Sequence, residues 1–167
     1  MTIRPETAAD YAAIHEVNRL AFGQDAEANL VDVLRDGGFL RLALVAEVGG
    51  QIVGHILFSR LPIITETGVV EALALAPMAV LPTHQRRGIG TLLVNEGLRA
   101  CREAGHKIVV VLGHPGFYPR FGFSAKLAER LTSPFGGGDA WMAVELVPGA
   151  LTGVVGRVEY PPPFAVF

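Results

Sequence analysis

The sequence predicts an α/β domain whose mixed, mostly antiparallel sheet is flanked by helices. Three observations lead to this class. Apolar residues recur at helical spacing in some segments and form compact aliphatic runs in others. Two such runs flank Gly49-Gly50, a pair typical of a two-residue hairpin turn, so the sheet should begin antiparallel. Farther on, an aliphatic run, a glycine-rich loop, a helical segment and another aliphatic run follow one another, which is α/β order.

The first half of the chain contains two expected helices and four expected strands. Thr7, with Asp10 three residues later, forms an approximate capping box, so a helix should begin after Thr7. Gly37-Gly38 should end the second helix. Pro77 has no N–H for a ladder, so its strand should have a bulge there or lie at an edge. The expected elements are a strand over residues 2–4, a helix reaching about residue 20, a helix over 26–36, and strands over 42–48, 51–61 and 69–81, with a turn over 62–68.

The second half should close the sheet. Gly105 should end a helix, and the run Pro161-Pro162-Pro163 should prevent further strand pairing. The expected elements are a helix over 90–104, a buried strand over 107–112, an irregular aromatic-rich segment over 113–123, and strands over 140–147 and 154–160. We expect a single domain over residues 1–167, with a core of about 1–147 and a C-terminal strand and proline-rich tail over about 148–167.

Composition narrows the function classes. Half of the 167 residues are hydrophobic, which excludes intrinsic disorder, and the net charge of −2 argues against broad electrostatic binding of nucleic acid. Cys101 is the only cysteine, which excludes a disulfide framework or a cysteine-based zinc site, and the five histidines lack a metal-binding spacing. The most apolar stretch, residues 72–82, is too short to cross a bilayer, and the N-terminus shows no targeting segment. We therefore expect a cytoplasmic protein with no metal, membrane or nucleic-acid partner.

The loop over residues 80–91 indicates an anion site. A helix start leaves several backbone N–H groups free and is positively polarised, and Gly88 and Gly90 let the backbone approach a ligand closely. Arg86 and Arg87 add positive charge, so the loop predicts a phosphate or pyrophosphate site. The loop lacks the Gly-Lys-Ser/Thr sequence of a nucleoside triphosphatase, and it lacks the third glycine of a dinucleotide-binding loop. Both of these protein classes are therefore disfavoured.

Two motifs in order carry a family resemblance. The run Gln85-Arg86-Arg87-Gly88-Ile89-Gly90 fits the pattern Gln/Arg-x-x-Gly-x-Gly/Ala, and the run Tyr118-Pro119-Arg120-Phe121-Gly122-Phe123 fits Tyr-x-x-x-Gly-Phe. From about Ile3 to Phe123 the sequence resembles the GCN5-related N-acetyltransferase (GNAT) superfamily, and within it small bacterial members with an unassigned acceptor. The resemblance implies a sheet whose fourth and fifth strands splay apart, with acetyl-CoA as co-substrate in the gap and no metal.

The resemblance also implies which residues bind acetyl-CoA. Backbone groups at the end of the fourth strand would pair with the pantetheine amides, and N–H groups of the loop would hold the pyrophosphate. The residues so assigned are Met78, Ala79, Val80, Gln85, Arg86, Arg87, Gly88, Ile89, Gly90 and Thr91.

The implied reaction is direct attack of a primary amine, from a small molecule or a protein, on the thioester. Tyr118 would serve the leaving thiolate, mainly as a hydrogen-bond donor, because a phenol with a pKa of about 10 is a weaker acid than a thiol at about 8.5. The family's strand carboxylate falls at Ala74, so that base is absent. Glu27, which lies near Asp25 at a helix start, is our candidate base. The alternative for Glu27 is a solvated acid that stabilises its own helix.

Further alternatives remain open at this level. The family's asparagine seven residues before the tyrosine is Val111 here, so its contacts would pass to His114 or to backbone. His55 and His114 are secondary candidates for contact with substrate, whereas Cys101 fits a small buried hydrophobe. An alternative function is a non-catalytic acyl-CoA-binding regulatory or partner protein with the same fold. The apolar C-terminus suggests a homodimer.

Overall fold

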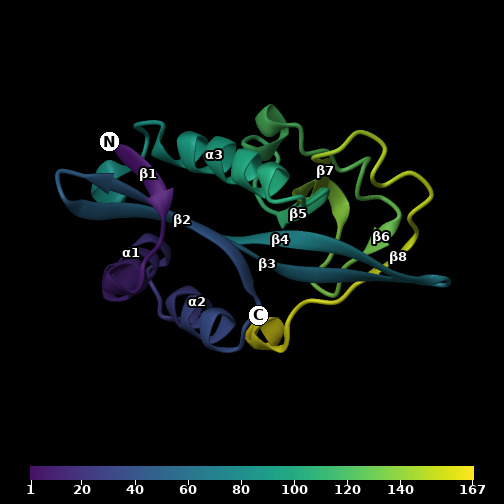
Figure 1. Cartoon of the computed structure of the whole chain (residues 1–167), viewed down its shortest axis with the longest axis horizontal. Coiled ribbons are helices and arrows are strands. Elements are labelled where there is room, and N and C mark those ends of the chain that lie inside the picture. Colours follow the sequence, from purple (N-terminus) through teal and green to yellow (C-terminus); the bar gives the residue numbers. More distant parts are fainter.

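A single mixed sheet forms the centre of the molecule (Figure 1). The computed structural model describes residues 1–167. The strand order is β1-β2-β3-β4-β5-β7, with β8 joining β3 and β6 joining β8; only the β4–β5 and β6–β8 pairs are parallel. The predicted class is therefore confirmed. The strands are β1 (Thr2–Pro5), β2 (Leu40–Val48), β3 (Gln51–Thr65), β4 (Gly68–Val80), β5 (Ile108–Leu112), β6 (Leu131–Thr132), β7 (Trp141–Glu145) and β8 (Gly156–Val158).

Helices cover both faces of the sheet. Figure 1 shows α3 (Ile89–Glu103) on one side and α1 (Tyr11–Phe22) with α2 (Ala26–Asp36) on the other. Each helix buries one apolar stripe, for example Leu30, Val31 and Leu34 of α2, because apolar residues three and four apart share a helix face. The C-terminal 3₁₀ helix η5 (Pro162–Val166) lies beside α2.

The β2–β3 hairpin turns at Gly49-Gly50, as predicted, and both glycines have positive φ. The expectation that the second strand ends at Leu61 was wrong, because β3 continues through Pro62 to Thr65. The carbonyl of Pro62 accepts from Glu159 N–H at 2.9 Å on the side where β2 has already ended. Pro62 therefore cannot return a hydrogen bond to the residue opposite, Glu159, but its missing N–H does not interrupt the β3–β4 ladder.

The sheet opens between β4 and β5. These strands pair at only two positions, Leu73 with Val109 and Ala74 with Val110. Immediately beyond, the two residues Ala76-Pro77 face the single residue Leu57 of β3, so β4 has the bulge predicted at Pro77. A bulge bends and twists its strand, which turns the end of β4 away from β5.

The closing segments differ in extent from the prediction. The strands expected over 140–147 and 154–160 are shorter, because chain reversals occupy the segment between β7 and β8 and the Glu145 carboxylate accepts from Leu151 N–H at 2.8 Å within it. The two-residue β6 and the 3₁₀ helix η3 (Tyr118–Phe121) were not predicted. The tail also packs back on the domain, since Phe164 is 5% exposed.

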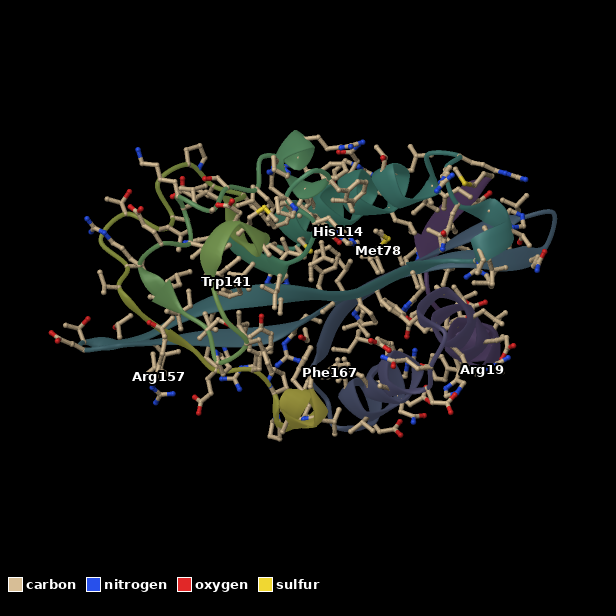
Figure 2. The ribbon with its side chains drawn as sticks, turned by 180° about the vertical axis from the view of Figure 1, so that it is seen from behind. Arg19, Met78, His114, Trp141, Arg157 and Phe167 are labelled. Atoms are coloured by element: carbon tan, nitrogen blue, oxygen red, sulfur yellow. The ribbon has the colours of Figure 1, made fainter.

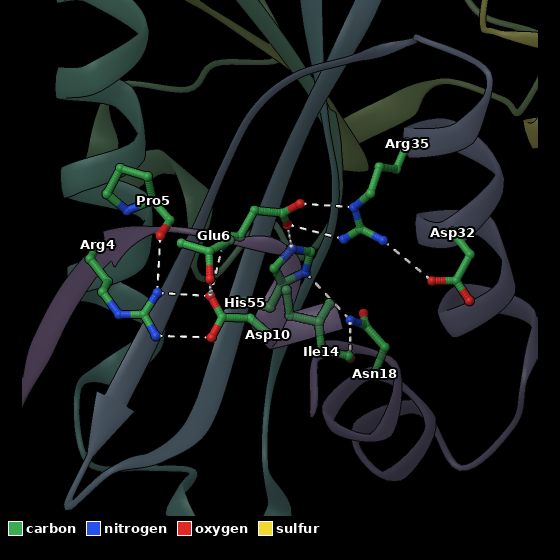
Figure 3. Close-up of polar contacts among 10 residues, drawn as sticks. Arg4, Pro5, Glu6, Asp10, Ile14, Asn18, Asp32, Arg35 and His55 are labelled. Carbon is green, nitrogen blue, oxygen red and sulfur yellow. Dashed lines mark hydrogen bonds and ion pairs between the residues drawn. The ribbon is translucent and has the colours of Figure 1, made fainter. Parts of the chain in front are cut away.

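A polar cluster fixes α1 and α2 on the sheet (Figure 3). Thr7 N–H donates to Asp10 Oδ2 at 2.8 Å, so the capping box exists, although a 3₁₀ turn (Ala8–Asp10) precedes α1. The fully buried His55 of β3 contacts Glu6 Oε1 through Nε2 at 3.0 Å, and Arg35 of α2 donates Nε–H to Glu6 Oε2 at 2.9 Å. This cluster holds the helix pair that walls the site described next.

Candidate active site

Two adjoining cavities lie at the opening between β4 and β5. The first, about 530 Å³, lies among the ends of α1 and α2, the opened strands and the C-terminal segment; we call it the aromatic pocket. The second, about 650 Å³, lies along the loop before α3; we call it the loop pocket. Met78, His114 and Phe117 line both, so the cavities adjoin at these three side chains. Figure 2 shows Met78 and His114 near the centre of the molecule, with Phe167 beside the C-terminal helix.

The loop pocket presents free backbone donors. The backbone N–H groups that begin α3 have no acceptor within the chain; they belong to Gly88, Ile89, Gly90 and Thr91. The first N–H that donates within the helix is that of Leu92, to Gly88 O. Gly88 takes a left-handed conformation, with φ of 80°. A Cβ on Gly90 would meet Met78 Cε at 3.4 Å, an ordinary contact, so residue 90 faces Met78 across the loop pocket. Such an array at a helix N-terminus fits a phosphate group.

The charge of the loop pocket also suits an anion. Arg86 and Arg120 line it, and no carboxylate does. Arg120 comes from η3, with its guanidinium 4.8 Å from the centre of the Phe117 ring. Sequence reasoning missed Arg120 as a site residue, although it stands inside the quoted tyrosine motif. Arg87 is exposed and lines neither cavity.

The Gln85 side chain ties the loop to the end of β4. Its Nε2 donates to Val80 O at 3.0 Å. Leu81 N–H, by contrast, donates to Val53 O of β3 at 2.8 Å. Because backbone groups alternate in direction along an antiparallel strand, the N–H groups of Met78 and Val80 point away from β3, toward the opening.

The three predicted residues at the end of β4 therefore differ in position. Met78 and Val80 line the loop pocket, whereas Ala79 is 3% exposed, pairs with His55 and lines neither cavity. Ile89 lines the loop pocket from the first turn of α3 and is itself largely buried.

Tyr118 lies in the aromatic pocket and is 7% exposed. Edge-to-face contacts with Phe117 and Phe123, at ring-centre distances of 5.0 and 5.6 Å, hold its ring. Burial raises the pKa of the phenol to about 12, and no hydrogen bond from its hydroxyl to the chain is present. The hydroxyl is thus a protonated donor whose hydrogen-bonding capacity is free for a ligand.

Glu27 lies in the same pocket, on the first turn of α2. The Gln24 side-chain amide contacts both carboxylate oxygens, at 2.9 and 3.1 Å. Glu27 supplies the only side-chain carboxylate of the pocket lining, which contains no lysine or arginine. The structure therefore brings Tyr118 and Glu27, which are 91 positions apart in the sequence, to one cavity. Glu71 does not reach it and instead approaches Arg60 on the surface at 3.5 Å.

The remaining candidate residues differ in whether they reach one of the two cavities. His114 lines both cavities, and Val111 lines the aromatic pocket. His55 lies in the polar cluster with Glu6 and reaches neither cavity, and Cys101 is a fully buried helix residue. No group of three or more metal-ligating side chains is present, and none of the helices is both long and apolar enough to span a bilayer.

Sequence reasoning also missed most of the aromatic pocket. Its outer lining comes from segments far apart in the chain, and no local motif links them. These residues are Phe22, Leu30, Phe135, Tyr160, Phe164 and Phe167.

Comparisons with known proteins agree with this geometry. A family model described as acetyltransferase (GNAT) domain matches residues 2–125. Over 162 residues, 96% of each chain, the sequence is 39% identical to YhbS of Escherichia coli (strain K12), described as an uncharacterized N-acetyltransferase. The crystal structure of Escherichia coli YhbS in complex with CoA matches with a TM-score of 0.90 at 37% identity, covering 98% of this chain and 91% of that one. A GNAT acetyltransferase from Brucella melitensis in complex with acetyl-CoA matches with a TM-score of 0.82 at 35% identity, covering 98% and 97%.

Proposed function

The chain belongs to the GNAT acetyltransferase family, and from that premise we propose that the loop pocket and the aromatic pocket together form its active site. It is an N-acetyltransferase that takes the acetyl group from acetyl-CoA. In our proposal the CoA moiety occupies the loop pocket and the acceptor amine enters through the aromatic pocket. The thioester lies where the cavities meet, beside Met78 and His114.

The proposed coenzyme contacts follow from the free donors. The pyrophosphate is held by the N–H groups of Gly88 to Thr91, with Arg86 and Arg120 supplying positive charge. The N–H groups of Met78 and Val80 pair with the pantetheine arm or polarise the thioester carbonyl. Gln85 contributes by fixing the loop to Val80 O, and Ala79 by its place in the β3–β4 ladder.

The proposed reaction is a direct transfer. Acetyl-CoA supplies the acetyl group and the thiol that leaves. The amine nitrogen bonds to the acetyl carbon as the carbon–sulfur bond breaks, so an ammonium acceptor must lose two protons. One proton passes through the Glu27 carboxylate to solvent, and the other ends on the CoA sulfur.

Tyr118 is proposed to donate a hydrogen bond to the sulfur as negative charge develops there. Its raised pKa, caused by burial, keeps the phenol protonated across the physiological range. The apolar surroundings strengthen this hydrogen bond, because little water competes for the charge.

We also propose a domain organisation, a cellular location and a set of partners for the chain. We propose that the chain works as one domain, supported by the packing of Phe164 against the main core. We propose action in the bacterial cytoplasm, supported by bacterial relatives and by the single, free cysteine. A net charge of −2 supports the absence of a nucleic-acid partner. The homodimer stays a prediction that sedimentation velocity would test.

The observation that carries the proposal is a pair of adjoining cavities with free backbone donors in one and Tyr118 and Glu27 in the other. Its test is Tyr118→Phe, with Tyr11→Phe, on the outside of α1, as control. With the best amine of a panel, kcat should fall roughly 10- to 1000-fold in Tyr118→Phe while the calorimetric Kd for CoA changes less than about twofold. An unchanged kcat would remove Tyr118 from the mechanism.

A further inference from the structure

The aromatic pocket concentrates the aromatic residues of this chain. Seven of the thirteen phenylalanine, tyrosine and tryptophan residues line it, although they come from five separate segments. A pocket that only had to admit a small polar amine would not need this much aromatic surface. The seven residues are Phe22, Phe117, Tyr118, Phe135, Tyr160, Phe164 and Phe167.

Part of this surface is a wall of three rings in edge-to-face and tilted contact. Tyr160 lies 4.9 Å from Phe135 at an interplanar angle of 69°, and 4.9 Å from Phe164 at 58°. Burial raises the pKa of the Tyr160 phenol, so this residue stays neutral. Phe164 is 5% exposed and η5 packs against α2, which fixes the wall beside Glu27. The wall is therefore a preformed apolar surface rather than a loose set of side chains.

Among the side chains of the pocket, one is negatively charged and none is a lysine or arginine. Glu27 supplies the only side-chain carboxylate, and thirteen of the seventeen lining residues are hydrophobic. The volume of about 530 Å³ lies within the range of small-molecule sites. One ammonium can pair with Glu27 and lie against aromatic faces. A second or third positive charge on the same molecule would be buried without a partner, which is costly.

We infer that the acceptor is a small amine that carries one positive charge and an aromatic or similarly bulky apolar body. This inference rests on the proposed function. The ammonium lies at Glu27, and the body packs against the wall formed by Phe135, Tyr160 and Phe164. The aromatic wall and the C-terminal segment then determine acceptor specificity.

The same surroundings assist the chemistry. An ammonium moved from water into an apolar pocket loses hydration, which lowers its pKa, whereas pairing with the Glu27 carboxylate raises it. The carboxylate is at the same time the group that can take the proton. Glu27, held by Gln24, lies in the pocket to receive the proton. The apolar lining and the Glu27 carboxylate therefore serve both the binding and the deprotonation of the acceptor.

A longer acyl chain on CoA would be a different occupant of this space. The carboxylate argues against it, because a hydrocarbon chain gains nothing from Glu27 and would bury part of a charged group. Hexanoyl-CoA is therefore included in the test as the competing donor.

The experiment compares 2-phenylethylamine, ethanolamine and spermidine as acceptors, by thiol release from acetyl-CoA with identification of the product by mass spectrometry. The kcat/KM for 2-phenylethylamine should exceed that for ethanolamine and for spermidine by about 10-fold or more, the expected effect of burying a phenyl ring. Separately, calorimetry of CoA-saturated protein with each amine measures binding without turnover. Preference for spermidine or ethanolamine in both measurements, or faster turnover of hexanoyl-CoA than of acetyl-CoA, would overturn the inference.

Two pairs of variants locate the effect. Phe22→Ala should raise KM for 2-phenylethylamine about threefold to tenfold, whereas Leu20→Ala, equally exposed on the same helix and outside the pocket, should not. Glu27→Gln should weaken binding of 2-phenylethylamine about 10-fold but leave inhibition by the uncharged 2-phenylethanol within about twofold. Asp25→Asn removes a nearby exposed charge outside the pocket and should change neither. Equal effects of Glu27→Gln on the charged and uncharged ligands would contradict the assigned role of Glu27.

Failure of the inference can be told apart from failure of the proposed function. If CoA binds and an amine other than 2-phenylethylamine is preferred in both turnover and binding, the function stands and the acceptor class is wrong. If CoA binds and none of the amines is turned over, the calorimetric ranking of the amines decides the acceptor class. If neither CoA nor acetyl-CoA binds, both fall together.

Discussion

The ring of Tyr118 lies directly against the α-carbon of Gly113. A Cβ on residue 113 would come within 2.4 Å of Tyr118 Cε2 and 2.8 Å of its Cδ2, closer than real contacts allow. Gly113 does not need a positive φ, so its role here is to leave space. This glycine, at the end of β5, sets how deeply the phenol enters the aromatic pocket.

Gly113→Ala should therefore move Tyr118 without unfolding the chain. We expect kcat to fall about 10-fold or more, because a displacement of about 1 Å in a catalytic group has effects of this size. The check is a double-mutant cycle, in which Gly113→Ala is made in both the parent and the Tyr118→Phe protein. In the Tyr118→Phe protein the alanine should cost no more than about twofold. An equal loss in both backgrounds would mean that Gly113 acts independently of the phenol.

Gly90 provides a matched test of the loop pocket. Gly90→Asp adds a carboxylate among the N–H groups of Gly88 to Thr91, where the pyrophosphate should lie. CoA affinity should fall by about 100-fold or more, while thermal stability should hold, because an acidic residue in the first turn favours the helix. Gly90→Ala, whose Cβ meets Met78 Cε at an ordinary 3.4 Å, is the steric control and should bind CoA within about threefold of the parent. Calorimetry and thermal melting measure both quantities, and a folded aspartate variant with parental affinity would contradict the assignment.

Arg86 combines a strained backbone conformation with a positive charge in the loop pocket. It is the only non-glycine residue with positive φ, at 64°, a conformation that costs a residue with a Cβ about 1 kcal/mol. Arg86→Ala and Arg86→Gly should both weaken CoA binding about threefold to tenfold, since each removes the same exposed charge.

The two variants should differ in stability. The glycine adopts this conformation without strain, so we expect Arg86→Gly to be more stable than Arg86→Ala by up to about 1 kcal/mol in urea unfolding. Equal stabilities would show that the loop relaxes around residue 86. Unchanged CoA binding in both variants would show that the guanidinium contributes nothing.

The polar cluster under α1 predicts the pH dependence of stability. Burial lowers the pKa of His55 despite the opposing hydrogen bond to Glu6, so His55 is neutral in the folded protein. In the unfolded chain the imidazole takes up a proton near its ordinary pKa of about 6.5. Between these two pKa values the unfolded state binds more protons, and stability falls as the pH is lowered through this window.

Glu6 and Asp10 continue the trend at lower pH. Burial would raise the pKa of Glu6, but hydrogen bonds from His55 and Arg35 outweigh it and the pKa is lowered. The hydrogen bond from Arg4 is the main reason that the pKa of Asp10 is also lowered. Each carboxyl contributes stability that is fully present above its unfolded pKa, about 4, and lost below it.

Urea unfolding from about pH 8 to pH 5 tests the contribution of the histidines to the pH dependence of stability. The free energy of unfolding should be nearly constant above about pH 7 and then fall, by at most about 1.4 kcal/mol per pH unit for each histidine. His55→Gln should remove part of this slope. His106, whose pKa burial also lowers, should account for a separate part, so His106→Gln is the matched comparison. An unchanged slope in His55→Gln would contradict the assignment of a lowered pKa.

Local signals in the sequence were sufficient for some features. The hairpin at Gly49-Gly50 and the bulge at Pro77 follow from backbone constraints of glycine and proline, which act within a few residues. The free N–H groups at the start of α3 follow in the same way from the glycines of the preceding loop, whereas its role as a CoA site stays a prediction. The sequence also directed attention to Tyr118 and Glu27, which the fold brings into one pocket.

Other features depend on tertiary contacts that no local signal contains. The extension of β3 through Pro62 required knowing that β2 has already ended at that point. The wall of Phe135, Tyr160 and Phe164 is assembled from residues up to 29 positions apart, joined only by packing. His55 could not be assigned to the core or the site until the position of its partner Glu6, which follows directly after β1, was known.

The central claim is that CoA binds along the end of β4 and the start of α3. Titration of isotope-labelled protein with CoA, followed by amide NMR, tests it most directly. We expect the largest chemical-shift changes at the N–H groups of residues 88–91, followed by those of Met78 and Val80. The amides of Gly136 to Gly138, which line a separate cavity, should stay unchanged. Shifts centred on 136–138, with 88–91 unmoved, would contradict the site.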